Sequence, residues 1–203
     1  NDMVKADCGG CNGCSRCCHG MGNSIILDPY DVYRMTTGMG KSMQELLAAS
    51  VELNVVDGVI LPNLKMQGAE EACAYLDGEG RCSIHPYRPG ICRLFPLGRY
   101  YENGGFSYFL QTGECAKENR SKIKVSKWID TPDLTRNQQF TLQWHDLLHA
   151  MEERLTGEDE GKQREENLLL LRLFYLLPYE GTIDFYTQFT ERMEHWNGQN
   201  GQI

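Results

Sequence analysis

The residues of this chain that could do chemistry are cysteines, and five of them lie within eleven positions near the N-terminus. Every third residue is a cysteine from Cys8 to Cys17, through Cys11 and Cys14, and Cys18 follows at once. The two residues inside each C-x2-C unit form a turn that directs both sulfurs to one point. Neighbouring thiolates repel one another unless a cation neutralises their charge. The run therefore predicts a metal centre.

Four more cysteines follow in turn-rich sequence, namely Cys73, Cys82, Cys92 and Cys115. Together with the first group they supply enough sulfur for two four-coordinate sites. His85 lies three residues after Cys82, and this C-x2-H pair could contribute to one metal site. The alternative is that His85 caps a turn or packs beside the prolines around it.

The spacing favours iron-sulfur over a single zinc ion. From Cys8 to Cys18 the chain has the C-x2-C-x2-C-x3-C pattern of bacterial ferredoxins, with His19 in place of their proline. Because Cys17 and Cys18 are adjacent and point in different directions, they serve two centres or leave one thiol outside the ligand set. Nine cysteines also exceed the needs of one zinc ion. We therefore expect an iron-sulfur cluster, with 4Fe-4S favoured.

Disulfide bonds are the alternative use of these cysteines. Nine cysteines in 203 residues fall below the density of a disulfide scaffold, and the count is odd. The adjacent Cys17 and Cys18 inside a three-residue repeat also suit few unstrained bridges. Metal ligation is therefore preferred to a secreted, disulfide-linked protein.

Charge and hydropathy narrow the class of protein. The net charge is -8 and the pI is about 5.2, and both oppose an electrostatic grip on nucleic acid or on an anionic membrane. The longest apolar run, from Leu168 to Leu177, is interrupted by Arg172 and is too short to span a membrane. No charged-then-apolar leader begins the chain. We expect a soluble, cytoplasmic protein with neither nucleic-acid nor membrane partners.

The front of the chain carries the signals of short hairpins and helices. Asp-Gly or Asn-Gly stands between apolar or aromatic runs in "VVDGVILP", "YLDGEGRC" and "YYENGGFSYFL", as in tight hairpins. Asp28 and Pro29 form a cap and first-turn pair for a helix over "PYDVYRMTT", which is expected to end before Gly38. Ser42 with Glu45 forms a capping box for "MQELLAAS".

The remainder of the chain is predicted to be helical. Thr131 and Pro132 open a helix with an apolar face, which closes at Gly157. The polar stretch "GEDEGKQREEN" is expected to connect it to a second helix, which runs through the leucines and ends at Pro178. The apolar stripe of a third helix consists of Phe185, Phe189, Met193 and Trp196. We expect these helices to cover the cysteine-bearing part or one another, because none could bury its stripe alone.

These patterns predict an α+β protein with two parts. Residues 1–120 are expected to form a small, turn-rich domain of short helices and hairpins, stapled by metal through its cysteines. Residues 121–203 are expected to form a C-terminal bundle of about three helices packed on it. All nine cysteines lie in the first part.

A second metal motif, "HDLLH", lies on the first of the three helices. His145 and His149 are four residues apart, the spacing that lets two imidazoles share zinc, and Asp146 stands where metallopeptidases place glutamate. Aspartate is shorter and less suited to reach a metal-bound water. Both histidines also fall beside the apolar stripe, on the flank with Glu152. We therefore expect solvated side chains here rather than a zinc hydrolase.

The cysteine motifs together resemble a known family. "CNGCSRCC", "CAYLD" and "CSIHPYRPGICRLFP" occur in the order found in the YkgJ-like cysteine-cluster proteins, which carry the CxxCxxCC zinc- or iron-chelating domain. The resemblance covers about residues 8–120 and implies metal chelation without an assigned reaction. It implies the ligands Cys11, Cys14, Cys17, Cys18, Cys73, Cys82, Cys92 and Cys115. Cys8 lies outside the four-cysteine signature.

A similar domain occurs in flagellin lysine methylases, where an iron-sulfur centre and S-adenosylmethionine are implied. This chain has no glycine-rich strand-turn-helix unit of the dinucleotide-binding kind. The stretch "GMGKS" at residues 38–42 follows a helix and lacks Walker spacing. The sequence therefore supplies no site for a nucleotide cosubstrate.

The leading hypothesis is a bacterial-type protein that holds an iron-sulfur cluster and has a redox, metal-handling or cluster-dependent catalytic role. Its metal ligands would be the cysteines implied by the resemblance, with Cys8 and His85 as additional candidates. The alternative is a zinc-stapled structural or protein-interaction module, with the helices as the partner surface. Redox activity separates the two, because zinc is inert to dithionite.

Overall fold

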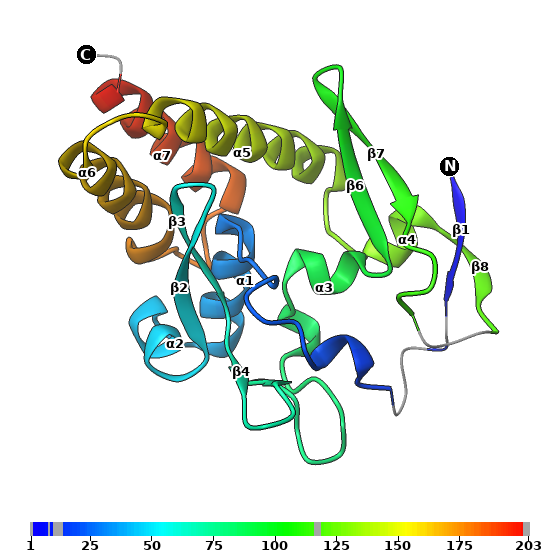
Figure 1. Cartoon of the computed structure of the whole chain (residues 1–203). Coiled ribbons are helices and arrows are strands. Elements are labelled where there is room, and N and C mark those ends of the chain that lie inside the picture. Colours follow the sequence, from blue (N-terminus) through cyan, green and yellow to red (C-terminus); the bar gives the residue numbers. More distant parts are fainter. Residues whose placement is uncertain (1, 8, 10–13, 116–118, 201–203) are drawn as a thin grey trace.

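The computed structural model describes residues 2–7, 9, 14–115 and 119–200, and it confirms the predicted α+β class (Figure 1). Small antiparallel hairpins dominate the first part, and helices dominate the part after residue 124. Each described sheet has two strands. The fold therefore depends on packing between elements more than on any extended sheet.

The first long helix, α1 (Pro29–Met39), begins at its predicted cap. The Asp28 side chain accepts a hydrogen bond from the backbone N–H of Asp31 at 2.8 Å, and Asp31 accepts one in return from the Asp28 N–H. The prediction that this helix ends before Gly38 is wrong. It ends at Met39, because the next residue, Gly40, takes the left-handed conformation (φ 63°) that glycine adopts readily.

Two of the three predicted hairpins form. β2 (Val51–Val56) pairs with β3 (Val59–Leu64), and β6 (Leu97–Glu102) pairs with β7 (Gly105–Leu110). In each two-residue turn, Asp-Gly or Asn-Gly, both residues have positive φ. This is the geometry of a type I′ turn, whose twist matches that of the flanking strands.

The hairpin predicted in "YLDGEGRC" is reduced to one antiparallel bridge. The stretch forms a loop with a single bridge, between Leu76 and Cys82. The Asp77 carboxylate accepts hydrogen bonds from the backbone N–H groups of Glu79 and Arg81 at 2.9 and 2.8 Å. These local bonds fold the loop on itself in place of a strand ladder.

Several elements of the first part are very short. α2 (Met43–Ala49) begins at the predicted capping box of Ser42 and Glu45, which is confirmed. β4 (Met66–Gln67) and β5 (Ala72–Cys73) pair over only two residues each. Elements of this size are marginal by themselves, so their positions depend on neighbouring segments.

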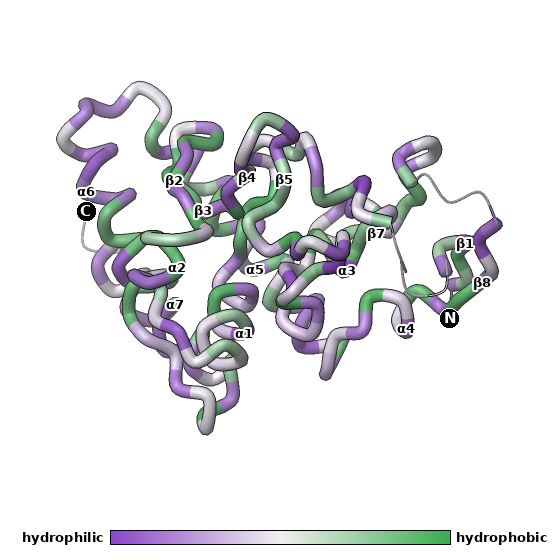
Figure 2. The backbone as a smooth tube through the Cα atoms, turned by 90° about the horizontal axis from the view of Figure 1, so that it is seen from below, coloured by the Kyte–Doolittle hydropathy of each residue, from purple (hydrophilic) through white to green (hydrophobic). Residues whose placement is uncertain are grey.

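The N-terminal strand lies beside the segment that leads into the C-terminal helices. β1 (Met3–Asp7) pairs antiparallel with β8 (Ser121–Lys124), and α4 (Val125–Ile129) follows β8 directly. No pattern in the sequence predicts α4. Figures 1 and 2 place β1 and β8 at the opposite end of the molecule from α6 (Glu160–Leu171).

The three predicted C-terminal helices are present. α5 (Leu134–Leu155) is followed by α6, which continues as a π-helix over Arg172–Leu176, and then by α7 (Phe185–Asn200). None of the helices in the described part of the chain is long and apolar enough to cross a membrane.

The polar stretch "GEDEGKQREEN" is mostly helix, and its prediction as a connector is wrong. The Asp159 side chain caps α6 by accepting hydrogen bonds from the backbone N–H groups of Gly161 and Lys162. Asn167, near the end of the stretch, is buried against the β2–β3 hairpin. The cap at Asp159 therefore begins a helix that has no apolar stripe in its first turns, and the buried contact of Asn167 holds its later part on the hairpin.

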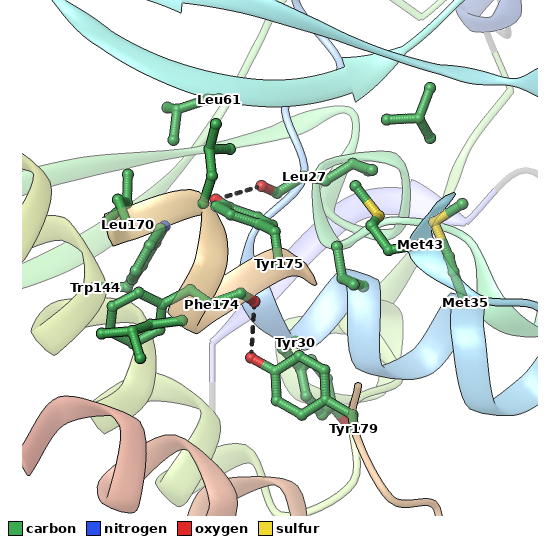
Figure 3. Packing of buried hydrophobic residues seen from close by; sticks show 14 of the residues in the cluster. Leu27, Tyr30, Met35, Met43, Leu61, Trp144, Leu170, Phe174, Tyr175 and Tyr179 are labelled. Carbon is green, nitrogen blue, oxygen red and sulfur yellow. Dashed lines mark hydrogen bonds between the residues drawn. The ribbon is translucent and has the colours of Figure 1, made fainter. Parts of the chain in front are cut away.

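One hydrophobic core joins the two parts of the chain (Figure 3). It combines buried residues of α1, α2, β2 and β3 with those of α5, α6, the π-helix and α7. The Tyr175 hydroxyl donates to the Leu27 carbonyl at 3.1 Å, and the Tyr179 hydroxyl donates to the Phe174 carbonyl at 3.0 Å. The division of the chain into two domains near residue 120 stays a prediction.

Candidate metal centre

Five described cysteines lie on four short segments of the first part. Cys17 and Cys18 belong to the 3-10 helix Arg16–Cys18, and Cys73 ends β5. Cys82 lies in the loop after β5, and Cys92 lies in α3 (Gly90–Leu94). Figures 1 and 2 show α3 between α1 and α4.

Backbone contacts bring the first two segments together. His19 forms a β-bridge with Ala72, and the Gly20 N–H donates to the Glu71 carbonyl at 3.0 Å. These contacts join the residues directly after Cys18 to the residues directly before Cys73. The two cysteine segments are therefore neighbours although about fifty residues separate them in sequence.

The Cys82 loop is tied to β5 in a similar way. The Ser83 backbone N–H and the Ser83 hydroxyl both donate to the Tyr75 carbonyl, at 2.9 and 3.0 Å. The Tyr75 hydroxyl in turn bonds to the buried Ser50 hydroxyl at 2.6 Å. Cys82 is thereby held beside the strand that ends in Cys73, on the surface of the main core.

The segment after Cys82 docks on α1. It forms a short 3-10 helix, His85–Tyr87, and the Arg34 guanidinium of α1 donates to the Pro86 carbonyl. The ring of Tyr87 lies against Gly38, where a Cβ atom would collide with it. This contact explains why a glycine occupies the interior of α1.

The adjacent thiols of Cys17 and Cys18 have opposite acidities. The Cys18 thiol hydrogen-bonds to Cys17 and lowers the pKa of Cys17 to about 6, with a further lowering from the positive charge of Arg88. The same hydrogen bond, together with burial, raises the pKa of Cys18. In the metal-free protein Cys17 is thus the thiolate and Cys18 the donor.

The other three thiols interact electrostatically with this pair. Burial raises the pKa of Cys92, and the negative charge of Asp31 raises it further. Charge on Cys73, Cys17 and Cys82 adds to this effect. Burial likewise raises the pKa values of Cys73 and Cys82, and each also responds to charge on Cys17. The five thiols are therefore close enough for the charge of one to affect the protonation of the others.

The remaining predicted cysteine ligands are not among the five gathered thiols. Cys14 and Cys115 are partly exposed free thiols, and all seven described cysteines are free. Cys8 and Cys11 lie outside the described residues. Within the described ranges, no group of three His, Cys, Asp or Glu side chains is arranged to hold a metal ion. The thiols are gathered without being closed around a common point.

His85 forms a hydrogen bond with Arg88. The Arg88 guanidinium lies 2.6 Å from its Nε2 atom, so this nitrogen accepts the hydrogen bond. Burial, followed by the charges of Arg88 and Arg81, lowers the pKa of His85, which keeps the ring neutral. The charge of Arg88 also lowers the pKa values of Cys17 and Cys82. The hydrogen bond to His85 therefore keeps the positive charge of Arg88 near these two thiols. Whether His85 is itself a ligand stays a prediction.

The histidines of "HDLLH" lie on the exposed side of α5. The His145 ring stacks on Tyr101 of β6 with 3.8 Å between ring centroids, and its Nδ1 lies 3.3 Å from Asp146. The His149 side chain is more than half exposed and lies 3.6 Å from Glu153. His149 is therefore exposed as expected, whereas the ring of His145 is partly covered by Tyr101.

The donor set suits the metals that bind thiolates. Thiolate ligands select zinc, Cu(I) and iron-sulfur clusters, whereas carboxylate and carbonyl oxygens select magnesium, calcium and manganese. The five gathered side chains all end in sulfur. They therefore fit a zinc or iron-sulfur centre and do not fit a site for a hard cation.

Comparison with known proteins bears on the same residues. No curated protein and no solved structure matches the chain. One family, described as "CxxCxxCC: Putative zinc- or iron-chelating domain", matches residues 10–125, more than half of the chain. This range contains eight of the nine cysteines. The chain belongs to the CxxCxxCC family of zinc- or iron-chelating domains.

Proposed function

We propose that the chain binds an iron-sulfur cluster, with 4Fe-4S favoured, through the cysteines of its CxxCxxCC run and those downstream. The observation that carries the proposal is the gathering of five thiols from four segments of the fold. The cysteines of the chain exceed the four ligands of one zinc ion. The proposed ligands are Cys11, Cys14, Cys17, Cys18, Cys73, Cys82, Cys92 and Cys115, with Cys8 and His85 as additional candidates.

The chain's own residues would prepare the thiols for the metal. Cys17 is ionised at neutral pH, because its pKa is lowered to about 6. The other gathered thiols have raised pKa values, so binding must displace their protons. Arg88 would offset part of the negative charge that accumulates on the sulfurs. An iron-sulfur cluster bound there would supply one-electron redox chemistry.

The role that we propose for the centre is redox, metal-handling or cluster-dependent catalysis, with a redox or protein partner. We place it in the bacterial cytoplasm, because reducing conditions there preserve free thiols. The acidic net charge of -8 argues against nucleic acid as that partner.

A zinc-stapled module is the second candidate. The observation that favours it is the small size of the elements that carry the cysteines: β5 has two residues, and the 3-10 helix Arg16–Cys18 has three. Segments this short gain stability from a structural metal. In this case the centre would fix the first part of the chain, and the helices would contact a partner.

The test uses full-length protein purified without oxygen. Iron, zinc and acid-labile sulfide are quantified in one sample, and its visible absorption is recorded before and after dithionite. A brown protein that contains iron and sulfide and bleaches on reduction supports the cluster. Colourless protein with stoichiometric zinc supports the zinc module. Protein that binds neither metal after reconstitution contradicts both.

A further inference from the structure

A buried ion pair joins α1 to the helix that carries Cys92. Asp31 and Arg93 are 2% and 4% exposed. The Asp31 carboxylate accepts a hydrogen bond from the backbone N–H of Gly90 at 2.6 Å, and the Arg93 Nη2 lies 3.8 Å from the same oxygen. Asp31 therefore contacts both the first residue of α3 and the side chain next to Cys92.

The opposite side of α3 is held by the segment that leads into the C-terminal helices. Arg93 Nη1 donates to the Thr131 hydroxyl at 2.9 Å. The Trp128 indole N–H donates to the Leu94 carbonyl at 3.3 Å, and Leu94 packs against the buried Ile129. α3 is thus held at three points: the backbone N–H of its first residue, the side chain of Arg93 and the carbonyl of its last residue.

An isolated helix of five residues has no stability of its own, because nucleation costs more than one turn returns. The direction of the Cys92 side chain therefore depends on these external contacts. No other described cysteine lies on a segment held through a buried ion pair.

Packing alone does not account for the choice of charged residues. Burying two ions costs free energy that their attraction only partly returns, and apolar residues of similar size often stabilise a protein as well. Arg93 also keeps its buried Nε without a hydrogen-bond partner in the described structure. Such a pair is better suited to fix one orientation of α3 than to add stability.

We propose that Asp31, Arg93 and Thr131 are positioning residues that aim the Cys92 thiol at the other gathered cysteines. This inference rests on the proposed metal binding. Through Thr131 it also connects the metal centre to the segment that begins the helical part of the chain. The residues act through α3 and do not themselves contact the metal.

The experiment is a Co²⁺ titration of the full-length, metal-free protein under reducing, oxygen-free conditions. Thiolate ligands give Co²⁺ an intense charge-transfer absorption, whose intensity per bound ion reports how many sulfurs bind. The variants are Asp31→Asn, Arg93→Lys, Thr131→Val and Thr131→Ser. Asn167→Ala is the matched control, since it removes a buried polar contact on α6, a helix that carries no cysteine.

Asp31→Asn and Arg93→Lys are expected to weaken Co²⁺ binding by roughly 10–100-fold and to lower the charge-transfer intensity per bound ion. Thr131→Val is expected to do the same to a smaller extent, and Thr131→Ser, which keeps the hydroxyl, to restore the wild-type values. Asn167→Ala should lose stability while both values stay unchanged.

The inference is overturned if the Asp31 and Arg93 variants, folded by circular dichroism, bind Co²⁺ with wild-type affinity and intensity. Should they fail to fold, the Thr131 pair decides, and equal spectra for Val and Ser overturn it. A wild-type protein without thiolate-to-cobalt bands contradicts the proposed metal binding instead, and the inference falls with it.

Discussion

The ring of Tyr87 lies against Gly38 of α1, with no room for a Cβ atom between them. Replacing Gly38 by alanine must therefore displace the ring and, with it, the short helix that begins at His85. Overpacking of this kind costs about 1–3 kcal/mol, of which alanine's helix propensity returns about 1 kcal/mol. We predict that Gly38→Ala lowers the free energy of unfolding in denaturant titrations.

The matched control is Gly198→Ala on α7, where nothing lies within 4 Å of the added Cβ atom. This variant should be as stable as the wild type or more stable, because only the propensity changes. Equal stability of the two variants would show that Tyr87 yields freely and does not hold the cysteine loop on α1.

Cys92→Ala should lose metal. The substitution removes one of the proposed sulfur ligands. The affinity for the metal is therefore expected to fall by more than the roughly 10–100-fold that is lost when a residue supporting a ligand is changed. Metal content per protein, measured by elemental analysis after desalting, checks this. His149→Ala is the control, since its side chain lies on the exposed side of α5. Unchanged metal content in Cys92→Ala would remove it from the ligand set.

Cys17 should be the most reactive gathered thiol of the metal-free protein at pH 7. Its pKa is lowered to about 6, so it is mostly thiolate, whereas Cys92 has a raised pKa and stays protonated. Alkylation by iodoacetamide, located by mass spectrometry, should modify Cys17 first. Its rate should fall as the pH drops through about 6 and the thiolate gains a proton.

Arg88→Ala is expected to slow this alkylation at pH 6–7, because the positive charge that helps to lower the pKa of Cys17 is lost. Arg164→Ala, on the exposed surface of α6, should leave the rate unchanged. If Cys92 reacts before Cys17, or if Arg88→Ala changes nothing, the assigned thiolate is wrong.

Asn167 anchors the β2–β3 hairpin on α6. Its Oδ1 accepts from the Ile60 N–H at 2.6 Å, and its Nδ2 donates to the Gly58 carbonyl at 3.2 Å. Asn167→Ala leaves these backbone groups without partners, so we predict a loss of about 1–3 kcal/mol in the free energy of unfolding. The exposed Asn197→Ala on α7 should cost nothing by the same denaturation measurement. If Asn167→Ala also left the free energy of unfolding unchanged, water would be replacing the hydrogen bonds of the side chain.

Local patterns predicted the local structure. The Asp57-Gly58 turn fixed the β2–β3 hairpin, since both residues take positive φ there. The pairing of β1 with β8 has no comparable signal, because it joins residues more than a hundred positions apart. The first turns of α6 are polar and carry no apolar pattern, so the sequence does not predict the start of this helix, which depends on the cap at Asp159.

The same contrast between local patterns and long-range contacts applies to the candidate site. Cysteine spacing identified the thiols, but their assembly depends on contacts such as the His19–Ala72 bridge, which no spacing encodes. Thr131 is predicted only to open a helix, and no pattern in the sequence assigns Asp31 to the site. Asp31 has one local signal, its place three residues after the cap Asp28, which is typical of a capping box and does not indicate the contact with α3.

X-ray absorption at the metal edge, on full-length protein purified without oxygen, tests the gathered-thiol centre most directly. The expected first shell consists mainly of sulfur at about 2.3 Å. If the metal is iron, a second shell of neighbouring iron atoms should accompany it. A first shell of nitrogen and oxygen, or protein that retains no metal, would contradict a centre built from Cys17, Cys18 and the downstream cysteines.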